Sequence, residues 1–185
     1  MQQNNNSGTI WTAIGAIASI IALYFPIRSM IKKKRKKVKV LISMQMSHLS
    51  DAEYEEIRED IMHLIYDLRK HHEVYFYNEF VPKIQDFDKN KFNPLDYLLE
   101  IKKSDWFIAI ITEKILSSIY FEAGYALAAG VNSVYFVTDD KVMPLVMRMI
   151  SADHPKVKVI RASSINEIKP RIVNLLNNSN NIEIA

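Results

Sequence analysis

Residues 8–27 form an apolar run, GTIWTAIGAIASIIALYFPI, that carries no charged side chain. A helix of about 20 such residues is long enough to cross the roughly 30 Å hydrocarbon core of a bilayer. The run therefore predicts a single transmembrane helix within residues 1–31. Because a chain of 185 residues allows one ordinary domain plus an appendage, any globular fold is expected in the residues that follow.

The charges on the two sides of this run differ sharply. Eight Lys and Arg residues lie at positions 28–39, whereas residues 1–9 carry no charged side chain. Basic flanks stay in the cytoplasm, and a cleavable signal peptide would show the reverse order of charge and apolar residues. We therefore expect a single-pass protein of the inner membrane, with its N-terminus outside and its C-terminal domain in the cytoplasm.

The basic cluster also explains the high isoelectric point. Of the 24 Lys and Arg residues, 16 remain outside the cluster against 21 Asp and Glu, so the rest of the chain is acidic. A basic linker at residues 32–37 is expected to attract anionic lipid. A DNA-binding arm is the alternative, but the cluster adjoins the predicted span, and no nucleic-acid partner is expected. The absence of cysteine excludes disulfides, cysteine zinc sites and thiol catalysis.

After the linker, short apolar runs alternate with amphipathic ones, which is typical of a parallel sheet covered by helices on both faces. WFIAII, at residues 106–111, is apolar throughout and is expected to be the central strand. We predict a flavodoxin-like α/β domain at residues 38–177, followed by a disordered tail at 178–185. Its five-stranded parallel sheet should have the order 2-1-3-4-5, with strands at residues 38–43, 73–77, 106–111, 133–137 and 157–160.

Two helix starts are marked by capping residues. Ser50 followed by Glu53 forms a capping-box pattern, and Asn93 followed by Pro94 is a cap with a first-turn proline. The second of these helices is expected to turn four apolar residues inward: Leu95, Leu98, Leu99 and Ile101.

Several common sites are missing from the sequence. Gly124 and Gly130 are the only glycines after the predicted span, so neither a dinucleotide fingerprint nor a P-loop is present. The five histidines show no metal-ligand spacing, and no serine lies in a G-x-S-x-G motif. We expect no metal site and no bound cofactor.

Glu122 is the strongest candidate for a functional residue. It is expected in about the first turn of the helix after the central strand, at the mouth of the crevice that such sheets form at the carboxyl ends of their strands. An acidic residue there also fits a helix dipole. Gly124 lies two residues later, and a glycine inside a helix costs about 1 kcal/mol relative to alanine. Either close packing on a neighbouring strand or an approaching ligand would explain this glycine.

Residues 101–140 resemble the nucleoside 2-deoxyribosyltransferase family. The family signature is a Ser/Asn-Asp pair before a buried strand and then E-x-G-x-A opening a helix; here these residues are Ser104, Asp105, Glu122, Gly124 and Ala126. A looser similarity extends over residues 38–175. Toll/interleukin-1 receptor domains are also similar, through LIS, SDWFIAIIT and a glutamate on the next helix. Both families cleave N-glycosidic bonds with a glutamate at this location.

The resemblance implies that Glu122 is the nucleophile, or the carboxylate that stabilises an oxocarbenium-like sugar. Substrate contacts would come from five residues: Ser43, Asp96, Ser118, Gly124 and Tyr125. Asp96 fits equally well as a first-turn helix carboxylate, and Tyr125 as a core residue. Small-molecule partners would be a nucleoside, a nucleotide or NAD as a substrate, and family members are often homo-oligomers.

The sequence departs from the transferase pattern at two places. Leu116 stands where the family has an aspartate, with Glu113 as the closest acid, and the first loop at residues 43–48 lacks glycine. These departures favour a hydrolase or a non-catalytic nucleotide sensor whose association clusters membrane helices. A tether for a partner protein is the third alternative. The resemblance and the predicted anchor together imply an effector in anti-phage defence or nucleotide signalling.

Overall fold

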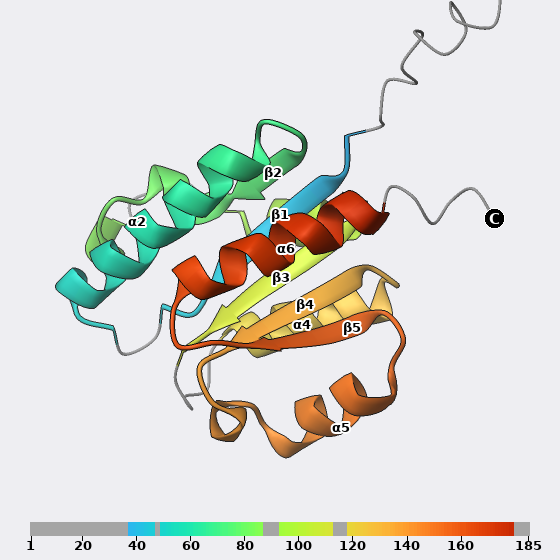
Figure 1. Cartoon of the computed structure of the whole chain (residues 1–185). Helices are drawn as coiled ribbons and strands as arrows, with labels where there is room; N and C mark the ends of the chain where they lie inside the picture. Colours follow the sequence, from blue (N-terminus) through green and yellow to red (C-terminus); the bar gives the residue numbers. More distant parts are fainter. Residues whose placement is uncertain (1–36, 47–48, 87–92, 113–117, 180–185) are drawn as a thin grey trace, which may run out of the picture. The chain divides into compact units, whose positions relative to one another are not determined.

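The computed structural model describes residues 37–46, 49–86, 93–112 and 118–179 (Figure 1). The predicted transmembrane helix, Glu113, Leu116 and residues 180–185 lie outside the described residues. Within the described ranges, no helix is both long enough and apolar enough to cross a bilayer. Membrane attachment through residues 8–31 and the contact of the basic linker with lipid stay predictions.

Five parallel strands form one sheet, and the predicted order is confirmed. The strands are β1 (Lys39–Met44), β2 (Glu73–Phe76), β3 (Trp106–Ile111), β4 (Asn132–Val137) and β5 (Val157–Arg161), arranged β2-β1-β3-β4-β5. β3 lies at the centre with all six of its residues buried, as its unbroken apolar sequence predicts. The strand order reverses between β1 and β3, so a crevice is expected at their carboxyl ends.

Helices cover both faces of the sheet. Helices α2 (Asp51–Leu68) and α6 (Ile165–Ser179) lie on the face toward the viewer in Figure 1. The opposite face carries α3 (Pro94–Lys103), α4 (Ser118–Ala128) and α5 (Leu145–Asp153). Three short 3-10 helices complete the described elements: η1 (Tyr77–Phe80), η2 (Ile84–Asp86) and η3 (Asp140–Val142).

Alternate residues of each strand supply two separate cores, because successive side chains of a strand point to opposite faces. Ile42 and Ile108 pack beneath α2 and α6, whereas Leu41 and Phe107 pack beneath α3 and α4. All four are 0% exposed. Burial of both faces explains why β3 reads as a continuous apolar run.

The predicted helix starts are confirmed. The Glu53 backbone N–H donates to Ser50 Oγ at 3.3 Å, and the Ser50 N–H donates to the Glu53 carboxylate at 2.8 Å, which completes the capping box. The Leu95 N–H donates to Asn93 Oδ1 at 3.1 Å, with Pro94 as the first residue of α3. Each cap of this kind stabilises its helix by about 1 kcal/mol.

The inward face predicted for α3 is partly wrong. Leu95 and Leu99 are 69% and 47% exposed, whereas Tyr97 and Ile101 are buried, and Leu98 is half-buried. Positions two apart on a helix point about 200° apart, so Leu95 and Leu99 face away when Tyr97 and Ile101 face the sheet. Apolar residues occupy both sides of α3, so periodicity alone did not select the buried face.

A buried histidine joins the edge of the sheet to the last helix. His72, 3% exposed, directly precedes β2 and hydrogen bonds to Asn177 of α6. Burial lowers the pKa of His72, the adjacent His71 lowers it further, and the bond to Asn177 opposes the shift. Folding therefore favours the neutral imidazole.

We expect this histidine to make the fold less stable in acid. Below the ordinary pKa of about 6.5, the unfolded chain binds a proton that the folded chain resists, so the free energy of unfolding falls as the pH drops toward the lowered folded pKa. The contribution is complete above about pH 6.5. Urea unfolding at several pH values should show a flatter dependence for His72→Gln, while the exposed His63→Gln keeps the wild-type slope. An unchanged slope in His72→Gln would assign the effect elsewhere.

Candidate active site

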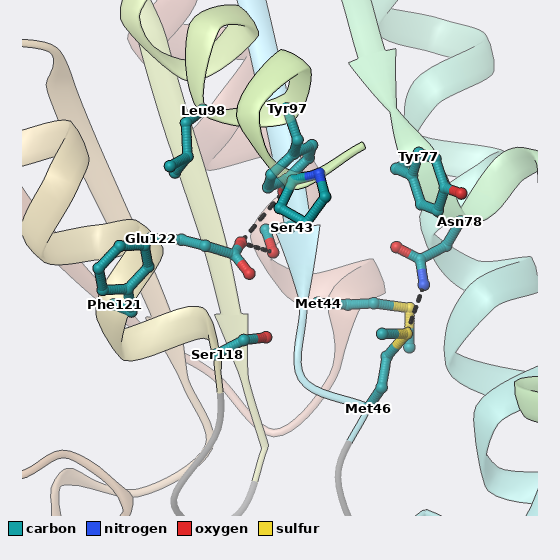
Figure 2. Close-up of a pocket in the computed structure, with 11 residues that line it drawn as sticks. Ser43, Met44, Met46, Tyr77, Asn78, Tyr97, Leu98, Ser118, Phe121 and Glu122 are labelled. Carbon is teal, nitrogen blue, oxygen red and sulfur yellow. Dashed lines mark hydrogen bonds between the residues drawn. The ribbon is translucent and has the colours of Figure 1, made fainter. Parts of the chain in front are cut away.

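A cavity of about 310 Å³ lies at the carboxyl ends of β1 and β2, between α3 and α4 (Figure 2). This is the position expected from the reversal of strand order. Its polar lining residues are Ser43, Asn78, Tyr97, Ser118 and Glu122. The remaining walls are apolar or aromatic, formed by Met44, Met46, Tyr77, Pro94, Leu98 and Phe121.

Ser43 and Glu122 meet at the floor of this cavity. Ser43 lies near the end of β1, is 5% exposed, and points to the same face of the sheet as Leu41. Its Oγ donates to Glu122 Oε2 at 2.5 Å. A buried hydroxyl in an apolar strand needs a hydrogen-bond partner, and the carboxylate supplies it. Ser118 lies four residues before Glu122, so both face the cavity from the same side of α4.

Tyr97 is the second donor to the same carboxylate oxygen. Its hydroxyl donates to Glu122 Oε2 at 3.1 Å (Figure 2). Burial raises the pKa of Tyr97 well above its usual range, and the negative charge of Glu122 adds to this shift. The phenol therefore stays protonated and remains a donor through the physiological range.

The two oxygens of Glu122 differ in their surroundings. Oε2 accepts from both Ser43 and Tyr97, whereas Oε1 accepts no hydrogen bond from any residue that the structure describes. Hydrogen bonds to a carboxylate are short and strong, and two of them hold its plane. This arrangement leaves Oε1 as the oxygen that a molecule bound in the cavity could contact.

The structure brings together three of the predicted site residues, Ser43, Ser118 and Glu122. Glu122 is the fifth residue of α4 and therefore lies beyond the first turn of the helix. A helix dipole acts most strongly on charges within that first turn. Asp96 does not line the cavity: it is exposed and accepts a hydrogen bond from Asn93 Nδ2 at 2.8 Å. Tyr125 is half-buried against the core beneath α4 and lies outside the cavity lining.

Gly124 and the Ser-Asp pair also lie apart from the cavity lining. A Cβ at Gly124 would meet nothing within 4 Å, so close packing on a neighbouring strand, one of the two explanations offered for this glycine, does not apply. Asp105 accepts from the Lys39 N–H at 2.8 Å, and Ser104 Oγ donates to the Glu100 carbonyl at 2.8 Å. Both of these bonds lie at the amino end of β3, the edge of the sheet opposite Glu122.

Tyr97 and Asn78 are the polar lining residues that the sequence analysis did not single out. Tyr97 lies four residues before Ile101, and this spacing could have indicated that the two residues share the buried face of α3. Leu95 and Leu99 have the same spacing on the other face, so the pattern did not single out Tyr97. A cavity does lie at the predicted strand ends, because its lining includes residues from the segments after β1 and β2 and from the start of α4.

The described lining of the cavity contains few charged groups. The described lining residues include one carboxylate and neither lysine nor arginine. Among the described residues, no group of three His, Asp or Glu side chains is placed to bind a metal ion. A fixed carboxylate between apolar walls suits a reaction in which positive charge develops on the bound molecule, because a low-dielectric surrounding strengthens that attraction.

A search of solved structures found similarity to a CMP N-glycosidase of Clostridium botulinum. The two chains are 17% identical, with a TM-score of 0.52, and the match covers 74% of this chain and 98% of the other. At this identity the similarity establishes the fold that the two proteins share. No protein-family model matches the chain. No curated protein sequence matches it either.

Proposed function

We propose that this protein cleaves the N-glycosidic bond of a nucleoside or nucleotide, with Glu122 as the reacting carboxylate. The observation that carries the proposal is the pairing of Ser43 and Tyr97 on Oε2, which leaves Oε1 toward the cavity. The shared fold with a CMP N-glycosidase supports the same class of reaction. NAD contains the same kind of bond and is a further substrate to test.

The reaction needs one carboxylate and one water molecule. Glu122 Oε1 attacks C1′ of the sugar, and the C1′–N bond breaks with its electron pair leaving on the base, which takes up a proton from solvent. Water then hydrolyses the glycosyl ester, releasing the sugar, regenerating the carboxylate and returning one proton to solvent. In an alternative without the ester, the carboxylate only stabilises the oxocarbenium-like sugar while water attacks.

The first test is a search for released base. The full-length chain, purified in mild detergent, is incubated with nucleosides, their 5′-monophosphates and NAD, and free base is followed by chromatography. Release that depends on Glu122 supports the proposal. Release that is equal in Glu122→Gln preparations would contradict the role of Glu122.

A nucleotide sensor is the second candidate. It is favoured by the described lining, which contains no second carboxyl group to protonate the departing base. Tight binding of a nucleotide without release of base would support this function. In that case ligand-dependent association of full-length chains, measured by cross-linking in membranes, should accompany binding.

We further propose that the domain acts on the cytoplasmic side of the inner membrane, anchored by residues 8–31 as an effector of anti-phage defence or nucleotide signalling. The uncharged run and the basic residues that follow it support this placement. Protease treatment of intact spheroplasts tests it: the C-terminal domain should be protected until the membrane is opened.

Tyr97→Phe is expected to lower kcat/KM for base release by about 10-fold, because a hydrogen bond to a charged group contributes roughly 1.5–3 kcal/mol and Ser43 keeps part of the orientation. Tyr120→Phe is the matched control, since its hydroxyl donates to the Val142 carbonyl at 3.0 Å outside the cavity lining. Steady-state kinetics of both variants measure the difference. Equal effects would show that Tyr97 acts only through stability.

A further inference from the structure

The strongest unassigned feature of the cavity is Asn78, which reaches it from the side opposite Glu122 (Figure 2). Asn78 belongs to η1 and is 6% exposed. Its backbone is held by Arg58, whose Nε donates to the Asn78 carbonyl at 2.8 Å and whose Nη2 donates to the Glu79 carbonyl at 2.9 Å. The side chain therefore extends into the cavity from a fixed backbone.

The orientation of the Asn78 amide follows from its neighbours. The Tyr54 hydroxyl has one hydrogen, which it donates to the Val81 carbonyl at 2.6 Å. It can therefore only accept from Asn78, so the amide nitrogen must face it, at 3.3 Å. The same nitrogen contacts Met46 Sδ, which can accept but not donate.

The amide oxygen is consequently directed away from Tyr54. Figure 2 shows it on the cavity side of the side chain, toward Ser43, while the nitrogen points to Met46. Oδ1 is an acceptor only, and of the neighbouring lining residues Met44, Met46 and Tyr77 only Tyr77 carries a side-chain group that can donate. The group presented to it by a ligand has to be a donor.

We propose that Asn78 selects a base that carries an exocyclic amino group, such as cytosine or adenine, over the keto base of the same ring. This inference rests on the proposed function. An amino group donates to Oδ1, whereas a keto oxygen at the same place would leave two acceptors facing each other with neither satisfied. The ring N–H of a keto base lies beside that oxygen, so it reaches Oδ1 only if the base shifts in the cavity.

The test compares matched amino and keto substrates with the full-length chain: cytidine with uridine, adenosine with inosine, and their 5′-monophosphates. We expect kcat/KM to favour the amino member by about 10- to 100-fold, the range for an unsatisfied buried acceptor. Asn78→Ala should lower kcat/KM for the amino substrate and bring the ratio near one. Asn132→Ala is the matched control, because Asn132 lies at the amino end of β4, and it should keep the wild-type ratio.

Tyr54→Phe tests the positioning role separately. Phenylalanine cannot accept from the amide, so the Asn78 side chain loses one of the two contacts that fix its direction, and only the contact with Met46 Sδ is left. The preference for the amino base should then fall, whereas the rate with the keto base stays close to that of the wild type. A uniform loss for both substrates would be the result of a merely structural role.

A binding measurement separates this inference from the proposed function. Calorimetric titration of Glu122→Gln with cytidine and uridine, and with adenosine and inosine, reports the preference without catalysis. Equal affinities, or equal losses for both members of each pair in Asn78→Ala, would overturn the role of Asn78 and leave glycosidase activity standing. A preference without base release in the wild-type chain would retain Asn78 and overturn the enzymatic proposal instead.

Discussion

Replacing Glu122 with glutamine is expected to lower the rate of base release by at least 10²–10³-fold, which is on the order of the loss when a group that stabilises developing charge is removed. Glutamine keeps the shape of the side chain, and its amide oxygen still accepts from Ser43 and Tyr97. It carries no negative charge to offset a cationic sugar and is a poor nucleophile. Single-turnover measurements of free base, made on the full-length chain, isolate this effect from product release.

Glu100→Gln is the matched control for this experiment. Glu100 lies on α3, where its exposed carboxylate pairs with Lys103 at 2.7 Å, and it does not line the cavity. The substitution should leave base release unchanged. Activity in Glu122→Gln within a few-fold of the wild type would contradict the role of Glu122, provided that both variants show the same circular dichroism.

Phe107→Ala is expected to destabilise the domain by about 3–5 kcal/mol, the range for truncating a buried aromatic side chain. Phe107 is 0% exposed in the central strand and belongs to the core beneath α3 and α4. Its removal leaves a cavity that the two flanking strands, β1 and β4, cannot close without distorting the sheet. Urea unfolding of the full-length chain in detergent, followed by circular dichroism, measures the change.

The exposed Leu95 provides the comparison for Phe107. Because its side chain is 69% exposed on α3, Leu95→Ala should change the free energy of unfolding by no more than about 0.5 kcal/mol. Similar losses for the two variants would contradict the assignment of Phe107 to a tightly packed core. A typical domain has only about 5–15 kcal/mol of stability, so Phe107→Ala is best studied at low temperature.

Destabilising β3 should also affect the site, because the strand that carries Ser43 and the helix that carries Glu122 both pack on β3. β1 carries Ser43 and pairs directly with β3, in register with Ser43 opposite Ala109. Helix α4, which carries Glu122, follows β3 in the chain and packs on it. The position of the carboxylate relative to its serine donor therefore depends on the packing of the central strand.

Much of the fold was predictable from the sequence because it depends on local patterns. Short apolar runs alternating with amphipathic segments indicated the five strands, and the capping residues Ser50 and Asn93 marked the starts of two helices. The alternation of strands and helices, combined with right-handed crossovers, led to the sheet order. The same reasoning put Glu122 near the carboxyl ends of the strands, where the cavity was found.

Local patterns of the sequence thus predicted the strands and the helix caps, because these depend on residues close together in the chain. Their alternation, with right-handed crossovers, indicated the strand order and the edge of the sheet where Glu122 lies. The buried face of α3 and the donors that hold Glu122 became known from the folded structure alone, because both depend on contacts between distant segments of the chain. Ser43 and Tyr97 lie 79 and 25 residues from Glu122 in the chain, and they meet on one oxygen only after the sheet and both helices have packed. The direction of the Asn78 amide has the same origin, since it depends on a hydroxyl 24 residues away whose single hydrogen is already donated.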